Sequence, residues 1–432
     1  MRYQHTKNRA PVRKLLTATL ILTLICTGLW AQNISVNGPY YIEHAVSKQT
    51  VSELSNPVSV KRTPELISKM SSARNACATI NTTYTGFTAD AVLAFEFAVD
   101  IWEASIETTI PVTVSAEFTS LNEDIVAFTE PNGYFTITGT GVPNTLYPRA
   151  LAEQLINSEI GSANSIDILV TIDTGHDFYY GLDANPPAGE IDFVTLILHQ
   201  LSHGLGFMGF GISDGTEGQI RDSTDGLPSI YDRFVVNGSG TEILSFPDPS
   251  TDLHQQLTGD DLFSSGSAAI AANNGNEPKI YSQSPFDFFK NYDHWDSSVF
   301  PAGTLNSLMT ETLAPGQANH NPGPVTLGLF EDMGWSLCQT LSTTDLQLTT
   351  FKIVENPVDD LLIIEVGSSL IGSKLEVTTY NLNGQIVSQR SRLIDSNLVR
   401  FDGFNNLSEG LYIANITALE NGARKRIKFV KK

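Results

Sequence analysis

The spacing of hydrophobic residues predicts helices mixed with strands, followed by a short β-rich end. Apolar residues from 91 to 102 recur at helical intervals after Thr88, whose hydroxyl can cap a helix that runs to about Ala104. Apolar–polar alternation predicts a strand at residues 112–118, and a β-branched run predicts another at 166–172. Two further helices are predicted at residues 149–158 and 325–333. The mixture predicts an α+β fold for this part of the chain.

The most apolar predicted helix lies within residues 191–207, IDFVTLILHQLSHGLGF. It places His199 and His203 four residues apart, and Gly204 and Gly206 end it. Side chains at this spacing share one helix face, so both imidazoles can reach one metal ion. The same pair also arises by chance in buried helices. A metal site therefore needs a third ligand elsewhere in the chain.

The strand predicted at residues 166–172 has two interpretations. Its place before the histidine helix suits the edge strand of a sheet, along which an extended peptide could pair. It could equally be an ordinary strand inside the sheet. A long segment rich in Gly, Ser, Asp and Asn follows the helix, up to about Asn291.

Short β-runs begin near Thr343 and predict a small antiparallel β-sandwich of about 80 residues. Asn383-Gly384 and Asn421-Gly422 have the composition of hairpin turns. The basic end, residues 424–432, is consistent with a nucleic-acid patch, but a solvated edge strand or a recognised terminus is the favoured interpretation. We find no catalytic cluster in this part of the sequence.

The charge of the chain disfavours nucleic-acid partners. The 432 residues carry a formal net charge of -21, which becomes more negative without the basic first 31 residues. Such acidity favours solubility outside the cell and leaves Ca²⁺ open as a second cofactor. Residues 1–31 have the basic stretch, apolar run and final Ala31 of a secretory signal peptide. The remaining sequence contains no apolar run long enough to cross a membrane.

Two cysteines, Cys77 and Cys338, remain after the predicted signal peptide. In an oxidising compartment, they most simply form one disulfide bond. The alternative is that Cys77 is a free thiolate that caps a metal ion in a latent form of the protein.

The histidine helix and three later segments together resemble the leishmanolysin-like zinc metallopeptidases, a group of the metzincins. Residues 199–207, HQLSHGLGF, match the family's H-E-x-x-H-x-x-G-F motif except at Gln200. His294-Trp295 matches its distant third ligand, Leu308-Met309-Thr310 its Met-turn, and residues 326–335 its closing helix. The likeness covers roughly residues 78–340. It implies a metzincin-like domain with one Zn²⁺ bound by His199, His203 and His294 above Met309.

The end of the chain resembles the C-terminal sorting domain of the type IX secretion system of Gram-negative bacteria. Asn356-Pro357-Val358, residues 380–385 and Gly410-Leu411-Tyr412 carry this likeness. It implies export through the outer-membrane secretion machinery to the medium or the cell surface. We therefore expect four segments: a signal peptide at 1–31, a pro-segment or N-terminal arm at 32–76, the peptidase domain at 77–340 and the sorting domain at 341–432.

Gln200 occupies the position of the family's general base. Its amide can hydrogen-bond a water molecule but cannot accept a proton at ordinary pH. This substitution leaves three hypotheses. The protein is a metalloendopeptidase relative with weak or no hydrolysis of peptides. It is an active hydrolase in which Glu190, Asp293 or His320 replaces the base. Or it is an inactive zinc-binding surface protein that holds extended peptides.

Overall fold

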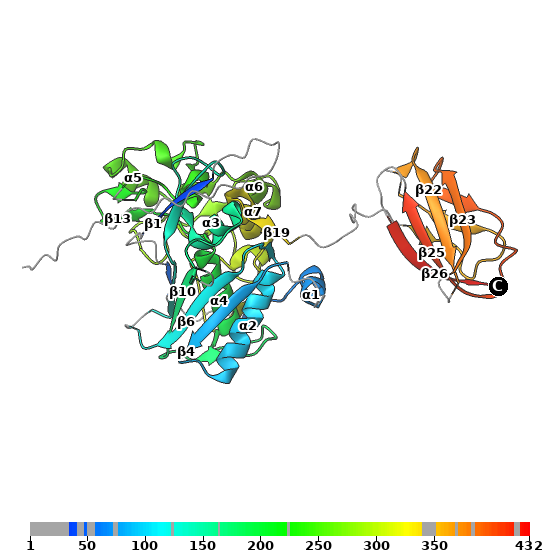
Figure 1. Ribbon diagram of the computed structural model, residues 1–432, viewed down its shortest axis with the longest axis horizontal. Helices are drawn as coiled ribbons and strands as arrows, with labels where there is room; N and C mark the ends of the chain where they lie inside the picture. The colour runs from blue at the N-terminus through cyan, green and yellow to red at the C-terminus, as the bar shows by residue number, and fades with distance from the viewer. Residues whose placement is uncertain are drawn as a thin grey trace, which may run out of the picture. The chain divides into compact units, whose positions relative to one another are not determined.

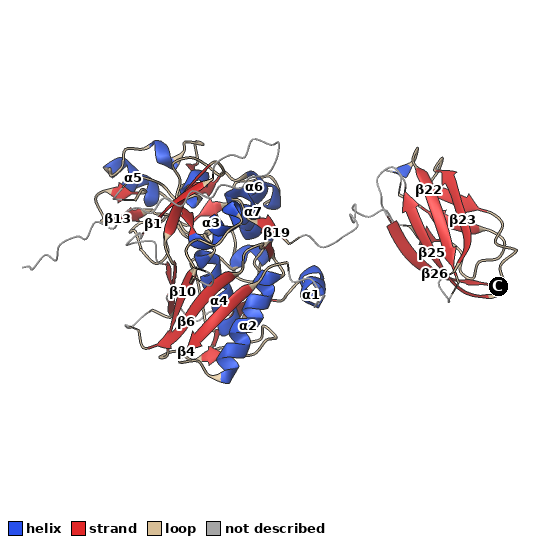
Figure 2. Ribbon diagram, viewed as in Figure 1, coloured by secondary structure: helices blue, strands red, loops and turns tan. Residues whose placement is uncertain are grey.

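The computed structural model describes residues 34–40, 47–49, 57–71, 77–121, 125–162, 165–222, 225–338, 351–367, 370–381, 385–418 and 424–432. The chain divides into two compact units, residues 1–338 and 339–432. The first unit mixes helices with sheets, and the second consists of antiparallel sheets (Figures 1 and 2). The predicted signal peptide lies outside the described residues. No described helix has the length and apolar character that a membrane span requires.

A five-stranded sheet organises the first unit (Figure 2). Its order is β2 (Ser47–Gln49), β7 (Ala127–Pro131), β10 (Ile168–Asp173), β6 (Val112–Thr119) and β4 (Ile80–Thr85). Strands β4, β6 and β10 are parallel, whereas β7 runs antiparallel to β10. The edge-strand interpretation of residues 166–172 is therefore wrong, because β10 is paired on both sides. A segment from the N-terminal part of the chain extends the sheet beyond β7: β2 pairs antiparallel with β7.

Two helices, α2 (Ala89–Glu103) and α4 (Phe193–Gly204), pack against each other beside this sheet. The predicted cap of α2 is confirmed, since the Thr88 hydroxyl accepts from the backbone N–H of Ala91 at 3.2 Å. Trp102 of α2 donates its indole N–H to the carbonyl of Leu198 in α4 at 3.2 Å. The bond fixes α4 against α2 one residue before His199.

Several short elements follow α4, and a final helix closes the unit. The predicted closing helix is confirmed as α7 (Pro324–Met333). The indole N–H of Trp335 then donates to the carbonyl of Leu205, just beyond α4, at 3.0 Å. Cys77 and Cys338 are joined by a disulfide bond, so the interpretation of Cys77 as a free thiolate ligand is wrong. The other short elements of the unit are α3 (Arg149–Ile156), β5 (Ile106–Glu107), β9 (Tyr147–Pro148), β11 (Phe178–Tyr179), β12 (Ile191–Asp192), β13 (Ile212–Ser213), β14 (Gly218–Gln219), η1 (Tyr231–Phe234), β15 (Val235–Asn237), η2 (Ile243–Ser245), α5 (Thr251–Leu257), β16 (Leu262–Ser264), α6 (Ser267–Ala272), β17 (Lys279–Ile280), η3 (Leu305–Ser307) and β19 (Ser336–Leu337).

The described residues before Cys77 pair with the rest of the first unit through three strands. β1 (Ser35–Tyr40) pairs antiparallel with β8 (Tyr134–Thr138), and β2 pairs with β7. β3 (Val58–Val60) pairs in parallel with β18 (Gln317–Asn319), and the helix α1 (Pro64–Ser71) follows. We call residues 34–71 the N-terminal arm, of which residues 34–40, 47–49 and 57–71 are described.

The second unit contains two antiparallel sheets around its own apolar core. Residues 424–431 form an edge strand paired with its neighbour, as the edge-strand interpretation of the basic end predicts. The predicted turns at 383–384 and 421–422 lie outside the described residues. The strands are β20 (Lys352–Ile353), β21 (Leu362–Glu365), β22 (Lys374–Tyr380), β23 (Ile386–Leu393), β24 (Leu398–Phe401), β25 (Gly410–Ala418) and β26 (Arg424–Lys431).

Candidate metal centre

The helix that carries the first two histidines is buried along its whole length. It begins at Asp192, whose carboxylate accepts from the backbone N–H of Thr195 at 2.9 Å and so caps the first turn. At Gly204, an added Cβ would lie 2.4 Å from Cγ2 of Ile168, so α4 approaches β10 too closely for any side chain. Cap and close packing together fix the register of His199 and His203 against the sheet.

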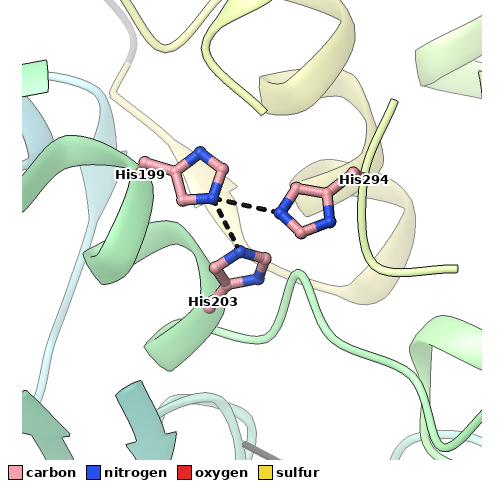
Figure 3. A group of neighbouring side chains, drawn as sticks. All are labelled: His199, His203 and His294. Carbon is pink, nitrogen blue, oxygen red and sulfur yellow. Dashed lines mark hydrogen bonds between the residues drawn. The ribbon is translucent and has the colours of Figure 1, made fainter. Parts of the chain in front are cut away.

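Three imidazoles converge in the first unit. The Nε2 atom of His199 lies 3.0 Å from that of His203 and 3.2 Å from that of His294 (Figure 3). All three rings are buried, and their nitrogens form a group that could hold a metal ion. Zinc–nitrogen bonds of about 2.0–2.1 Å in a tetrahedral site place two nitrogens roughly 3.3 Å apart. The donor spacing therefore fits a single zinc ion.

The outer nitrogen of each ring faces a backbone carbonyl. Nδ1 lies 2.8 Å from the carbonyl oxygen of Leu308 in His199, 2.7 Å from that of Phe207 in His203, and 3.0 Å from that of Lys290 in His294. A carbonyl only accepts, so each neutral ring carries its proton on Nδ1 and turns an Nε2 lone pair inward. Three lone pairs that face one another repel unless a cation lies between them. Metal binding explains this arrangement, and mutual hydrogen bonding of neutral rings does not.

Burial also keeps the rings neutral. It lowers the pKa of His199 to about 4 and lowers the pKa values of His203 and His294 well below their usual range. Neutral imidazole is the form that binds metal. No proton has to be displaced from these rings at neutral pH before a divalent cation can bind.

The turn after α4 explains the second glycine of the motif. Gly206 adopts φ 120°, which is open to glycine and strained for other residues. The backbone N–H of Phe207 donates to the carbonyl of Ser202 at 3.0 Å, and the Phe207 carbonyl then faces Nδ1 of His203. The turn at Gly206 therefore supplies the acceptor that orients one of the rings.

Gly206→Ala should destabilise the unit by about 1–3 kcal/mol, the typical cost of a residue held in an unfavourable backbone conformation. It should also weaken zinc binding, because the Phe207 carbonyl would shift away from His203. Thermal melts with and without added zinc measure both effects. Gly189→Ala is the matched control, since nothing lies within 4 Å of an added Cβ there. Equal melting temperatures and zinc shifts for the two variants would show that the turn does not orient His203.

Gln200 of α4 is fully buried and contacts β7. Its Oε1 accepts from the hydroxyl of Thr129 in β7 at 2.8 Å. Its Nε2 has no hydrogen-bond partner among the described residues. A buried amide group without a partner costs free energy. The amide cannot accept a proton at ordinary pH.

Two of the three candidate substitute bases already have structural partners. His320 Nε2 lies 2.8 Å from Oδ2 of Asp192, so this buried ring contacts the carboxylate that caps α4. Asp293 accepts from the backbone N–H of Gly209 at 2.8 Å, and burial raises its pKa well above the usual range. Glu190 lies partly buried just before β12. None of these contacts shows that His320, Asp293 or Glu190 acts as a base.

The segment around Met309 contacts one metal-site histidine and the residue that follows another. The carbonyl of Leu308 faces His199, and the carbonyl of Met309 accepts from the backbone N–H of Trp295 at 2.7 Å. Trp295 and Phe207 are buried with ring centroids 4.9 Å apart, as expected for packing residues. The role of Met309 beneath a metal ion stays a prediction.

Sequence reasoning missed the residues that orient the site from outside. Thr129 carries no motif, and the carbonyls of Leu308 and Lys290 could belong to any residue type. Asp192 did leave a signal, because an Asp directly before an apolar helix is a typical N-cap. Gly209 packs against Tyr292: an added Cβ would lie 2.3 Å from that ring.

Two family profiles match parts of the chain. Residues 43–220 match the SPBPB7E8-like family, and residues 352–432 match the secretion system C-terminal sorting domain. The first match includes His199 and His203 and ends before His294. The second indicates that the protein is secreted or displayed at the cell surface in Bacteroidetes, and that it engages the type IX secretion machinery. Neither description names a peptidase.

No curated protein matches the chain. Among solved structures, it is similar to PorZ, described as an essential bacterial surface component of the type-IX secretion system of Porphyromonas gingivalis. The identity is 16% and the TM-score 0.17, over 36% of this chain and 20% of that chain. A TM-score this low carries no argument about fold or function.

Proposed function

We propose that the first unit is a zinc-binding relative of the leishmanolysin-like metalloendopeptidases, with peptides or proteins as its substrates. The observation that carries the proposal is the convergence of three buried Nε2 lone pairs, each held by a carbonyl behind its ring. A zinc ion in such a site supplies a Lewis acid that polarises a peptide carbonyl and acidifies water. The order of His199, His203, His294 and Met309 along the chain supports the metzincin-like assignment.

The side chains of this chain have distinct roles around the ion. His199, His203 and His294 would bind it, and Gln200 would orient a water or a carbonyl group from the β7 side. Because Gln200 cannot accept a proton, hydrolysis should be about 100- to 10,000-fold slower than with a carboxylate at this position. We also propose the four segments 1–31, 32–76, 77–340 and 341–432, with the third exported and the fourth directing that export.

A second candidate function is a zinc-binding surface protein that holds peptides without cleaving them. The neutral amide at position 200 favours it, because Gln200 accepts from the Thr129 hydroxyl but cannot accept a proton at ordinary pH. The His triad gives no support to a calcium site, since nitrogen ligands suit zinc and calcium prefers oxygen.

The zinc content of the purified protein, from residue 32 onward, tests the metal site. We expect about one zinc per chain after zinc loading and dialysis, measured by elemental analysis. Chelation should remove the ion and lower the melting temperature, because a ligand that binds only the folded state stabilises it. A zinc content near zero under these conditions would contradict both candidate functions.

A further inference from the structure

Tyr292, two residues before the third histidine, has an unusual backbone conformation. Its φ of 79° lies in the left-handed region, which a bulky side chain rarely adopts and which its surroundings must therefore hold. Two backbone bonds fix this segment: Tyr292 N–H donates to the Tyr281 carbonyl at 2.8 Å, and Tyr281 N–H donates to the His294 carbonyl at 2.9 Å. The conformation at Tyr292 therefore sets the direction in which the chain enters His294.

The ring of Tyr292 is fully buried in a slot beside two glycines that follow α4. A Cβ added at Gly209 would lie 2.3 Å from this ring, and one added at Gly211 would lie 2.6 Å from it. Neither glycine adopts the left-handed conformation, so the packing of Tyr292 and its neighbours, and not a backbone conformation, requires glycine at both positions. A side chain at either position would displace the ring of Tyr292.

One buried carboxylate ties the hydroxyl of Tyr292 to the same segment. The hydroxyl donates to Oδ1 of Asp232 at 2.9 Å, and the backbone N–H of Phe210, between the two glycines, donates to the same oxygen at 3.1 Å. Oδ2 of Asp232 accepts from the backbone N–H of Ser229 at 2.7 Å. Burial raises the pKa of Asp232 to about 6, so the group is ionised at neutral pH and its hydrogen bonds are of the stronger, charge-assisted kind. The ring of Tyr292 is thus fixed at its far end as well as beside the glycines.

Two further bonds join residues 292 and 293 to elements that follow α4. Oδ1 of Asp293 accepts from the backbone N–H of Gly209 at 2.8 Å. The Tyr231 hydroxyl donates to the Tyr292 carbonyl at 2.8 Å. Gly209 lies five residues after the end of the helix that carries the first two imidazoles. The position of the third imidazole relative to the other two therefore depends on these contacts.

We propose that Tyr292 is a positioning residue: held by Asp232 and the two glycines, it places Nε2 of His294 at the 3.2 Å from His199 that one metal ion requires. This inference rests on the proposed function only in taking the three histidines as ligands of one ion. A tyrosine that served the core alone would change the melting temperature when altered and leave the metal affinity unchanged. Groups that orient a metal ligand change the affinity by about 10- to 100-fold, so the two roles have different readouts.

The test uses Tyr292→Phe in the protein from residue 32 to its end. The change keeps the ring in its slot and removes the hydroxyl that Asp232 holds. We expect the zinc affinity to fall about tenfold, measured by competition with a chelator. We also expect a shift in the visible absorption bands of Co²⁺ bound in place of zinc, because these bands report the geometry of the ligands around the ion. Tyr84→Phe is the matched control and should leave both unchanged, since it removes a hydroxyl of β4 that donates to the Glu96 carboxylate of α2 at 2.5 Å.

Equal zinc affinities and identical Co²⁺ bands for Tyr292→Phe, Tyr84→Phe and the unsubstituted protein would overturn the inference, even if Tyr292→Phe melts at a lower temperature. If Tyr292→Phe does not fold, Asp232→Asn replaces it. That change keeps the shape of the side chain and weakens the bond from Tyr292 by removing the charge, so a fall of a few-fold in zinc affinity is expected, and an unchanged affinity would contradict the inference. An unsubstituted protein that binds neither ion would instead sink the proposed function and this inference with it, whereas equal binding by all variants sinks the inference alone.

Discussion

Gln200→Glu should raise the rate of zinc-dependent peptide hydrolysis by about 100-fold or more over the unsubstituted protein, the usual contribution of a general base. The substituted side chain has almost the same shape. One carboxylate oxygen can accept from the Thr129 hydroxyl as the amide oxygen does now. The other takes the place of the buried Nε2 that has no hydrogen-bond partner among the described residues, and it can accept a proton. Initial rates on a denatured protein substrate, with and without a chelator, measure the effect.

Gln255→Glu makes the same chemical change on the exposed surface of α5 and should leave the rate unchanged. Chelator-sensitive cleavage by the unsubstituted protein would instead favour a substitute base. A Gln200→Glu protein that binds zinc, melts normally and remains inert would exclude the view that only the base is missing. That result would favour the peptide-binding function.

His294→Ala should lower the affinity for zinc by more than about 100-fold, because even changes in the groups that orient a metal ligand cost 10- to 100-fold. The variant keeps the two histidines of α4 but loses the ring that approaches His199 from the other side at 3.2 Å. Competition with a chromogenic chelator gives the affinity, and thermal melts should no longer shift upward when zinc is added.

His254→Ala is the matched control for this experiment. His254 lies in α5, where its Nδ1 contacts the Ser213 hydroxyl at 2.6 Å, and it is not one of the three converging rings. We expect its zinc affinity to equal that of the unsubstituted protein. Should His294→Ala bind zinc as tightly as His254→Ala does, the third ligand would have to be another group.

The helices were predictable because their signals are local. The Thr88 cap, the apolar spacing of α2 and the glycines after α4 each lie within a few residues of the feature they specify. The position of a strand within a sheet is not local. The apolar sequence of β10 is compatible with both an edge strand and an internal strand. Its internal position depends on pairing with β7, a short strand (AFTEP) whose sequence carries no strong β signal.

The same distinction applies to the metal centre. The i, i+4 spacing places His199 and His203 on one face, but nothing in that spacing indicates His294, which lies 95 residues after His199. Only the likeness to a family suggested that ligand. The carbonyls that orient the rings left no trace in residue identity, because every residue has one; Gly206 is the exception, since its backbone conformation requires a glycine.

The disulfide bond closes residues 77–338 of the first unit into a covalent ring. Cys338 is the last residue of that unit, and its partner Cys77 lies 261 positions earlier, just before β4. A protease that trims the protein after Cys338 would cut outside this ring and could not free the strands and helices within it. Loss of the C-terminal segment during maturation would therefore leave the three histidines within a segment whose two ends remain covalently joined.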